Sequence, residues 1–200
     1  MEIRPEELPV LQDLDTSLYE FVLEDLDSGV NVLESNKGKV TMIVNVTGEC
    51  ANSAQYIPIQ SLYDEYKDRG FKVVAVPSTD FCEHAYGEFT DSNASPQNMR
   101  DHMKKLYKTD LPFSKQTATV ENSKTGLDIH PLYEKLQSIG GPMQGNFEKI
   151  IISKNGKKIF RFCNSDLLNL GYDAGDRSID ADTALILIKK AIETLLNEEE

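Results

Sequence analysis

The chain has 200 residues, enough for one domain whose hydrophobic core needs no disulfide or metal ion for stability. Its formal net charge of −12 argues against a nucleic-acid-binding surface, which would need clustered Lys and Arg side chains. No apolar run is long enough to span a membrane. We therefore expect neither nucleic acid nor a membrane as a partner.

The first 16 residues are polar and acidic, so we predict an N-terminal extension over residues 1–16 and a single domain over 17–200. This segment also lacks the apolar stretch of a signal peptide. The three cysteines, which cannot all pair and match no zinc motif, are Cys50, Cys82 and Cys163. We expect a cytoplasmic protein with reduced or redox-active thiols and no bound metal.

The rest of the chain alternates between strand patterns and amphipathic helix patterns. In order, we predict a turn at 25–29, a strand at 39–46, a helix at 53–69, a strand at 71–76, a helix at 96–107, a helix starting near 131, a hairpin of 147–153 and 158–162, and a helix at 182–196 with its apolar stripe toward the core. The first strand–helix–strand unit has short links, which predicts a right-handed crossover between parallel strands. The pattern therefore indicates an α/β fold with a central mixed sheet and helices on both faces.

Cys50 lies in the turn after the strand at 39–46, directly before a predicted helix. Reactive groups in an open parallel sheet gather beyond the carboxyl ends of the strands. Unpaired backbone N–H groups and the helix dipole favour a thiolate at a helix N-terminus, and a thiolate attacks peroxide oxygen. Position alone leaves two interpretations open, a reactive nucleophile and a structural thiol.

Four short motifs occur in one order along the chain. They are KGKVTMIVNVTGEC at 37–50 with the pair Gln55-Tyr56, FKVVAVP at 71–77, HPLY at 130–133 and NFEK at 146–149. Together they resemble the signature segments of the glutathione peroxidase family, from about residue 17 to residue 163. The resemblance implies a thioredoxin-like fold in which Cys50 is the peroxide-reducing nucleophile.

The same resemblance implies an active-site tetrad of Cys or selenocysteine, Gln, Trp and Asn. Cys50 and Asn146 stand at two of these positions, whereas the Gln position reads His84 and the Trp position reads Gly145. His84 is the predicted replacement, either as a hydrogen-bond donor or as a cation that lowers the pKa of Cys50. Without the indole ring, we expect a more open site.

A peroxidase of this kind forms a sulfenic acid that a second thiol must resolve. The family's thioredoxin-dependent members carry a resolving cysteine on the helix at 96–107, where this chain has Lys104. Cys82 is the candidate substitute, and its alternative interpretation is a loop residue without a redox role. Cys163, at the end of a predicted strand, is predicted to be a buried structural thiol.

The predicted function is thus a thiol-dependent peroxidase that reduces hydrogen peroxide or small organic hydroperoxides, uses glutathione or thioredoxin as reductant, and needs no cofactor. Only residues 137–145 separate the HPLY helix from the NFEK motif, whereas tetrameric family members have a longer insertion, so we expect a monomer or dimer. The alternative is a degenerate binding or regulatory module, favoured by the altered tetrad and by a loop at 164–180 that has no family counterpart. A soft-metal site on Cys50, Cys82 and His84 is a weaker third interpretation, because no second ligand pair accompanies them.

Overall fold

A computed structural model describes residues 8–48, 50–81, 95–123, 126–168 and 180–199. Within these residues, five strands form one sheet in the order β1-β5-β4-β2-β3. Their bounds are Gln12–Asp13 (β1), Val40–Val46 (β2), Phe71–Pro77 (β3), Lys149–Ile152 (β4) and Lys158–Phe162 (β5). Only β2 and β3 run parallel, and the other neighbours are antiparallel. The predicted mixed sheet is confirmed.

The two parallel strands lie where an apolar, β-branched sequence predicts them. All seven residues of β2 are buried, because helices cover both faces of the sheet. Val40 is opposite Phe71, and Val46 is opposite Pro77, so both strands end at the same edge. This edge is where the turn that carries Cys50 begins.

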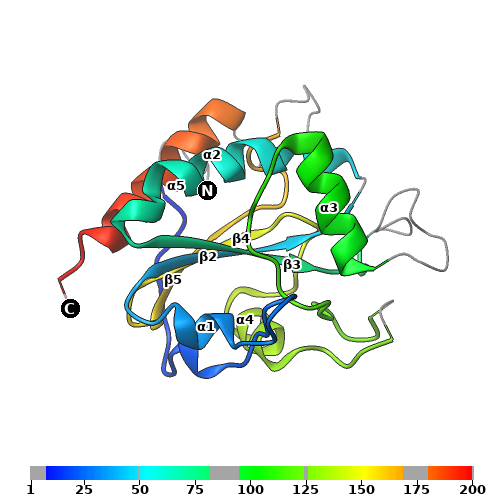
Figure 1. Ribbon diagram of the computed structural model, residues 1–200. Helices are drawn as coiled ribbons and strands as arrows, with labels where there is room; N and C mark the ends of the chain where they lie inside the picture. The colour runs from blue at the N-terminus through cyan, green and yellow to red at the C-terminus, as the bar shows by residue number, and fades with distance from the viewer. Residues whose placement is uncertain (1–7, 49, 82–94, 124–125, 169–179, 200) are drawn as a thin grey trace.

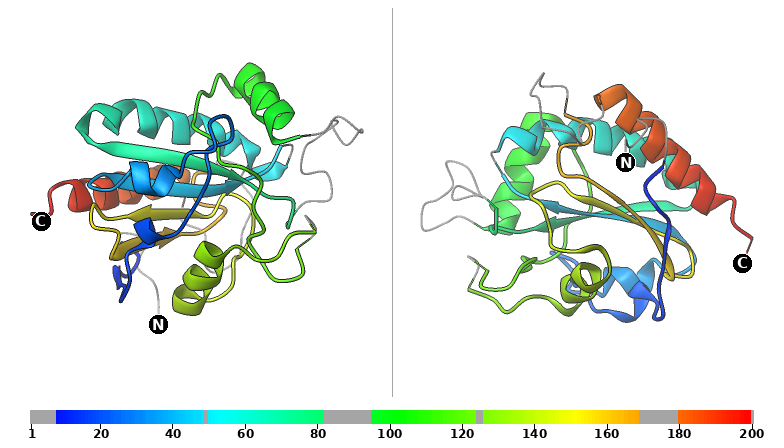
Figure 2. Two further views of the ribbon diagram at one scale, coloured as in Figure 1. Left: turned by 60° about the horizontal axis from the view of Figure 1, so that its bottom comes forward. Right: turned by 180° about the vertical axis from the view of Figure 1, so that it is seen from behind.

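Helices cover both faces of the sheet, as predicted (Figures 1 and 2). They are α1 (Val32–Ser35), α2 (Tyr56–Tyr66), α3 (Pro96–Tyr107), α4 (Pro131–Gly140) and α5 (Ala181–Leu196), together with the short 3-10 helices η1 (Leu18–Glu20), η2 (Ala51–Gln55) and η3 (Lys67–Arg69). Helices α2, α3 and α5 pack in one apolar cluster, and α4 packs with η1 in another on the opposite face. Within the described ranges, no helix combines the length and the apolar character needed to cross a bilayer.

Three local features differ from the predictions by more than one residue. The helix expected at 53–69 is η2, α2 and η3 in succession, and it ends at Gly70 with a φ of +89°. Helix α1 was not predicted, because its four residues are too few to show a helical period. Strand β4 begins at Lys149, two residues later than expected, because Phe147 turns the chain with a φ of +70°.

Both edges of the sheet are short or covered. At one edge, β1 pairs only two residues with β5. The next residue, Leu14, donates its N–H to Lys157 O (2.8 Å), and its side chain is buried. Residues 12–14 therefore join the sheet, while the domain boundary at residue 16 stays a prediction. At the other edge, the N–H of Ala75 donates to Pro112 O (2.8 Å) and the N–H of Thr117 donates to Pro77 O (2.9 Å), so the segment at 112–117 runs along β3.

His130 caps α4, as its place before Pro131 predicts. Its Nδ1 accepts the N–H of Leu132 (3.2 Å), and its Nε2 therefore carries the hydrogen that is donated to Val22 O (2.9 Å). Burial lowers the pKa of His130 below its ordinary value, against an opposing effect of the bond to Val22. The histidine is held neutral, with both ring nitrogens used.

We expect His130→Ala to lower the free energy of unfolding by about 1 kcal/mol, because the cap is lost, whereas His130→Asn keeps a capping acceptor. The pKa of His130 is lower in the folded than in the unfolded state. The contribution of His130 to the free energy of unfolding is therefore present above the unfolded pKa and is lost as the pH falls through the folded pKa. Urea unfolding at pH 7 and at pH 5 measures both effects. Equal stability of the Ala variant and the wild type, or an unchanged pH dependence in the Asn variant, would contradict the assignment.

Candidate active site

Cys50 lies where the sequence predicts it, beyond the carboxyl end of β2. The strand ends at Val46, Thr47 and Gly48 turn the chain, and η2 begins at Ala51. The Cys50 side chain is half-buried and packs against the core cluster that contains α2 and α3. Because η2 leads directly into α2, the sulfur lies at the positive end of a continuous helical segment, which favours the thiolate.

Ser53 organises the turn around Cys50. Its Oγ accepts the N–H of Cys50 (3.0 Å), and its own N–H donates to Cys50 O (3.0 Å). The same Oγ lies close to Gly48 O and 3.7 Å from the Sγ of Cys50. A hydroxyl has one hydrogen, so Ser53 donates either to the Gly48 carbonyl or to the sulfur. When Cys50 is ionised, a donor is therefore within reach.

Ser53→Ala should slow the reaction of Cys50 with hydrogen peroxide about tenfold and shift its pH–rate profile to higher pH, because the thiolate loses a donor. Ser61→Ala is the matched control, since Ser61 lies on the exposed side of α2 and donates only to Ile57 O. Stopped-flow rates between pH 5 and pH 9 make the comparison. Identical profiles for both variants would show that the Ser53 hydroxyl does not act on the sulfur.

An aromatic wall lies behind Cys50. Tyr56 is fully buried, its hydroxyl donates to Thr47 O (3.2 Å), and its ring meets Phe147 edge-on with centroids 5.1 Å apart. Burial raises the pKa of Tyr56 well above its ordinary value, and the neighbouring Cys50 acts in the same direction. Tyr56 therefore stays protonated and forms an apolar support for the nucleophile.

Asn146 is hydrogen-bonded to η2, the 3-10 helix that follows Cys50. The Nδ2 of Asn52, in η2, donates to Asn146 O (3.1 Å). Asn45, near the end of β2, fixes the same turn, because its Nδ2 donates to Gly145 O (2.9 Å) and its Oδ1 accepts the N–H of Glu148 (3.0 Å). The Asn146 side chain is only 4 % exposed, and its Oδ1 accepts no hydrogen bond from the described residues. Hydrogen bonds thus link η2, which follows Cys50, to the turn that carries Asn146.

His84 and Cys82 lie outside the described residues, so their predicted roles stay predictions. The last anchor before them is Asp80, whose carboxylate accepts the N–H of Thr119 (2.7 Å) and the hydroxyl of Ser123. Burial alone would raise the pKa of Asp80, but these hydrogen bonds outweigh it and hold the pKa below its ordinary value. The ionised carboxylate of Asp80 therefore fixes the chain just after β3.

A family model described as glutathione peroxidase matches residues 18–137, more than half of the chain. The chain belongs to the glutathione peroxidase family. The glutathione peroxidase homolog BsaA of Staphylococcus epidermidis is 30 % identical over 151 residues, which is 73 % of this chain and 88 % of that protein. The chloroplastic phospholipid hydroperoxide glutathione peroxidase 1 of Arabidopsis thaliana is 29 % identical over 154 residues, 74 % of this chain. The match spans only 60 % of that longer protein.

Solved structures show the same fold. GPX1 of T. cruzi superposes with a TM-score of 0.60 at 22 % identity, covering 90 % of this chain and 97 % of that one. A thioredoxin-like superfamily protein superposes with a TM-score of 0.57 at 13 % identity, covering 96 % and 99 %. The predicted thioredoxin-like fold is confirmed, and membership of the glutathione peroxidase family supports a thiol peroxidase role.

One glutathione peroxidase motif residue is buried in a place that its motif alone does not predict. Lys149, the lysine of NFEK, is fully buried in β4, and its Nζ donates to Cys163 O (3.0 Å) and to Asp166 O. Burial lowers the pKa of Lys149 to about 7, while Asp166 opposes this shift. A lysine in the apolar run KIII, followed by an acid after the partner strand, was the available signal.

The start of the loop at 164–180, which has no counterpart among the family motifs, reaches the Cys50 helix. The Nε2 of Gln55, fully buried at the end of η2, donates to Asn164 O (2.7 Å). Cys163 is half-buried rather than fully buried as predicted, and its N–H donates to the carboxylate of Asp166 (2.8 Å). Residues 169–179 lie outside the described part of the chain. The described beginning of this loop is therefore hydrogen-bonded to the helix that follows Cys50.

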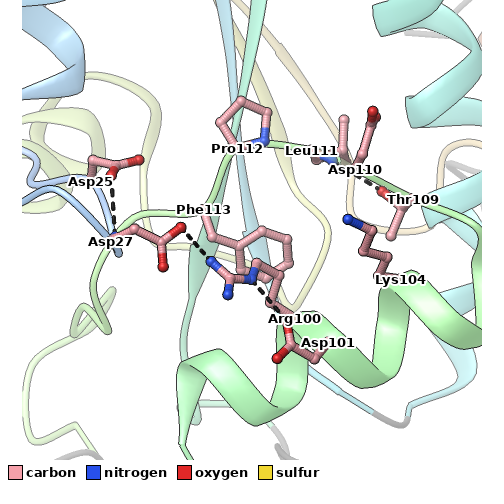
Figure 3. A pocket seen from close by; sticks show the side chains of 10 residues that line it. All are labelled: Asp25, Asp27, Arg100, Asp101, Lys104, Thr109, Asp110, Leu111, Pro112 and Phe113. Atoms are coloured by element: carbon pink, nitrogen blue, oxygen red, sulfur yellow. Dashed lines mark hydrogen bonds and ion pairs between the residues drawn. The ribbon is translucent and has the colours of Figure 1, made fainter.

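Lys104, which the resemblance places near the resolving-cysteine position, lines a pocket between α3 and the turn at 25–29 (Figure 3). In this pocket Arg100 forms ion pairs with Asp27 (2.6 Å) and Asp101 (3.2 Å). Neither described cysteine lines it. The pocket is therefore a charged surface feature separate from the lining of the Cys50 site.

Proposed function

We propose that this protein is a thiol-dependent peroxidase that reduces hydrogen peroxide or small organic hydroperoxides through Cys50. The observation that carries the proposal is the position of the Cys50 sulfur at the start of η2, 3.7 Å from the Ser53 hydroxyl. Asn146, tied to the same helix through Asn52, supports it by adding a buried carboxamide to the site. Family membership supports the same chemistry.

In the first step, the Cys50 thiolate attacks one peroxide oxygen. An S–O bond forms as the O–O bond breaks, and the departing oxygen takes a proton and leaves as water or an alcohol. His84 is the proposed proton donor, and Asn146 the proposed hydrogen-bonding partner. Two electrons pass from the sulfur to the peroxide, and Cys50 becomes a sulfenic acid.

In the second step, a thiol attacks the oxidised sulfur, an S–S bond forms, and the sulfenic oxygen leaves as water. Cys82 is the proposed internal thiol, and otherwise glutathione or thioredoxin attacks directly. A further thiol of the reductant then breaks the disulfide and restores Cys50. The proposal includes a cytoplasmic monomer or dimer that needs no bound cofactor.

The test is a single-turnover reaction of the reduced wild-type protein with hydrogen peroxide, followed by intact mass in the presence of a sulfenic-acid trap. We expect Cys50 to be oxidised orders of magnitude faster than free cysteine. A Cys50–Cys82 disulfide in the product would identify the resolving thiol. A rate equal to that of free cysteine would overturn the proposal and favour the binding or regulatory module.

A further inference from the structure

Gly145 has no side chain, and the carboxamide of Asn164 occupies the space above it. A Cβ at position 145 would lie 3.1 Å from the Cγ of Asn164 and 2.6 Å from its Nδ2, and the second distance is shorter than real Cβ contacts. The φ of Gly145 is not in the left-handed region, so its backbone does not require glycine. A side chain at position 145 would therefore have to displace the Asn164 carboxamide.

Asn164 is held in place from both sides by buried groups. Its carbonyl accepts the Nε2 of Gln55 (2.7 Å), and Gln55 is fully buried at the end of the helix that Cys50 begins. The carbonyl before it, that of Cys163, accepts the Nζ of the buried Lys149 (3.0 Å). Such supporting contacts fix a functional side chain more tightly than a free loop would.

The Asn164 carboxamide is still available to bind a ligand. Its Nδ2 makes no hydrogen bond to any residue in the described ranges, whereas its carbonyl and that of Cys163 both accept one. Directly after Gly145, Asn146 is 4 % exposed, and its Oδ1 likewise has no described partner. A buried polar atom without a partner is costly unless a ligand or water satisfies it.

We propose that Asn164 is a further polar residue of the Cys50 site. Its side-chain N–H donates to the peroxide from the space that a side chain at position 145 would otherwise fill. This inference rests on the proposed peroxidase function and extends it. The donor would bind the oxygen that leaves as the O–O bond breaks, where negative charge develops. A donor supplied from the loop after β5 thus compensates for a glycine before Asn146.

Asn164→Leu tests the proposal, because leucine has nearly the same shape and no N–H. We expect its rate of oxidation by hydrogen peroxide to fall tenfold to about a hundredfold. Alkylation of Cys50 by iodoacetamide, which needs no donor to a leaving oxygen, should stay within about twofold of the wild-type rate. An unchanged peroxide rate, or an equal fall in alkylation, would overturn the inference.

Gly145→Ala provides an independent variant, because the added Cβ displaces the Asn164 carboxamide without changing its chemistry. We expect a similar loss of peroxide rate, and no further loss in the Gly145→Ala/Asn164→Leu double variant. Full additivity of the two losses would overturn the shared role. If the wild type itself reacts no faster than free cysteine, the proposed function fails, and that outcome is seen before any variant is compared.

Discussion

Replacement of Cys50 by serine is expected to abolish fast peroxide consumption, with a loss on the order of a thousandfold or more. A serine hydroxyl is not ionised at neutral pH, and its oxygen cannot pass through the sulfenic acid that the two-step reaction requires. The side chain is half-buried and similar in size to serine, so the fold should be kept. Stopped-flow oxidation and intact mass measure the loss directly.

Cys163→Ser is the matched control, because Cys163 is also half-buried and serine keeps the backbone groups that bond to Lys149 and Asp166. Its first-turnover rate should equal that of the wild type. A Cys82→Ser variant should keep the first step and lose only an internal disulfide, if Cys82 resolves the sulfenic acid. Fast peroxide consumption in Cys50→Ser would contradict the assignment of the nucleophile.

Lys149→Met is expected to destabilise the fold by about 2 to 4 kcal/mol at pH 7, because the buried carbonyls of Cys163 and Asp166 lose their donor. Peroxide oxidation of Cys50 should also slow, since the backbone that carries Asn164 loses one of its two anchors. Urea unfolding and the single-turnover assay test the two effects. Wild-type stability in Lys149→Met would mean that the hydrogen bonds from Lys149 to Cys163 O and Asp166 O do not stabilise the fold.

The pH dependence of stability provides a second readout for Lys149. Burial lowers its folded pKa to about 7, below the ordinary 10.5 of the unfolded chain, so the unfolded state binds more protons between these values. The free energy of unfolding therefore rises with pH from 7 toward 10.5, by about 1 kcal/mol per pH unit, and this contribution is constant below pH 7. Lys149→Met should lack that rise, and an equal slope in the two proteins would contradict the assignment.

Local patterns predicted most of the fold because they depend on near neighbours in the sequence. The buried run of β2, the capped start of α3 at Ser95 and the apolar stripe of α5 each follow from residues a few positions apart. Helix α1 shows the limit of this reasoning, since it depends on Asn31 as a cap and has a single turn.

The site was only partly predictable for the same reason. Cys50 follows from the strand–turn–helix order, and Asn146 from a motif. The contact of Asn164 with Gly145 joins two loops 19 residues apart, and the Gln55–Asn164 bond joins residues 109 apart. Such pairings have no local period, so they become visible only when the chain is folded.

The covered edges of the sheet limit how copies of this protein can associate. Along β3 the segment at 112–117 already uses backbone groups that a visiting strand would need, and β1 offers only two residues. Within the described part of the chain, neither margin presents a long ladder on which a foreign strand could grow. A dimer would therefore have to form through helix or loop surfaces. Amyloid-like stacking would first require the segment at 112–117 to separate from β3.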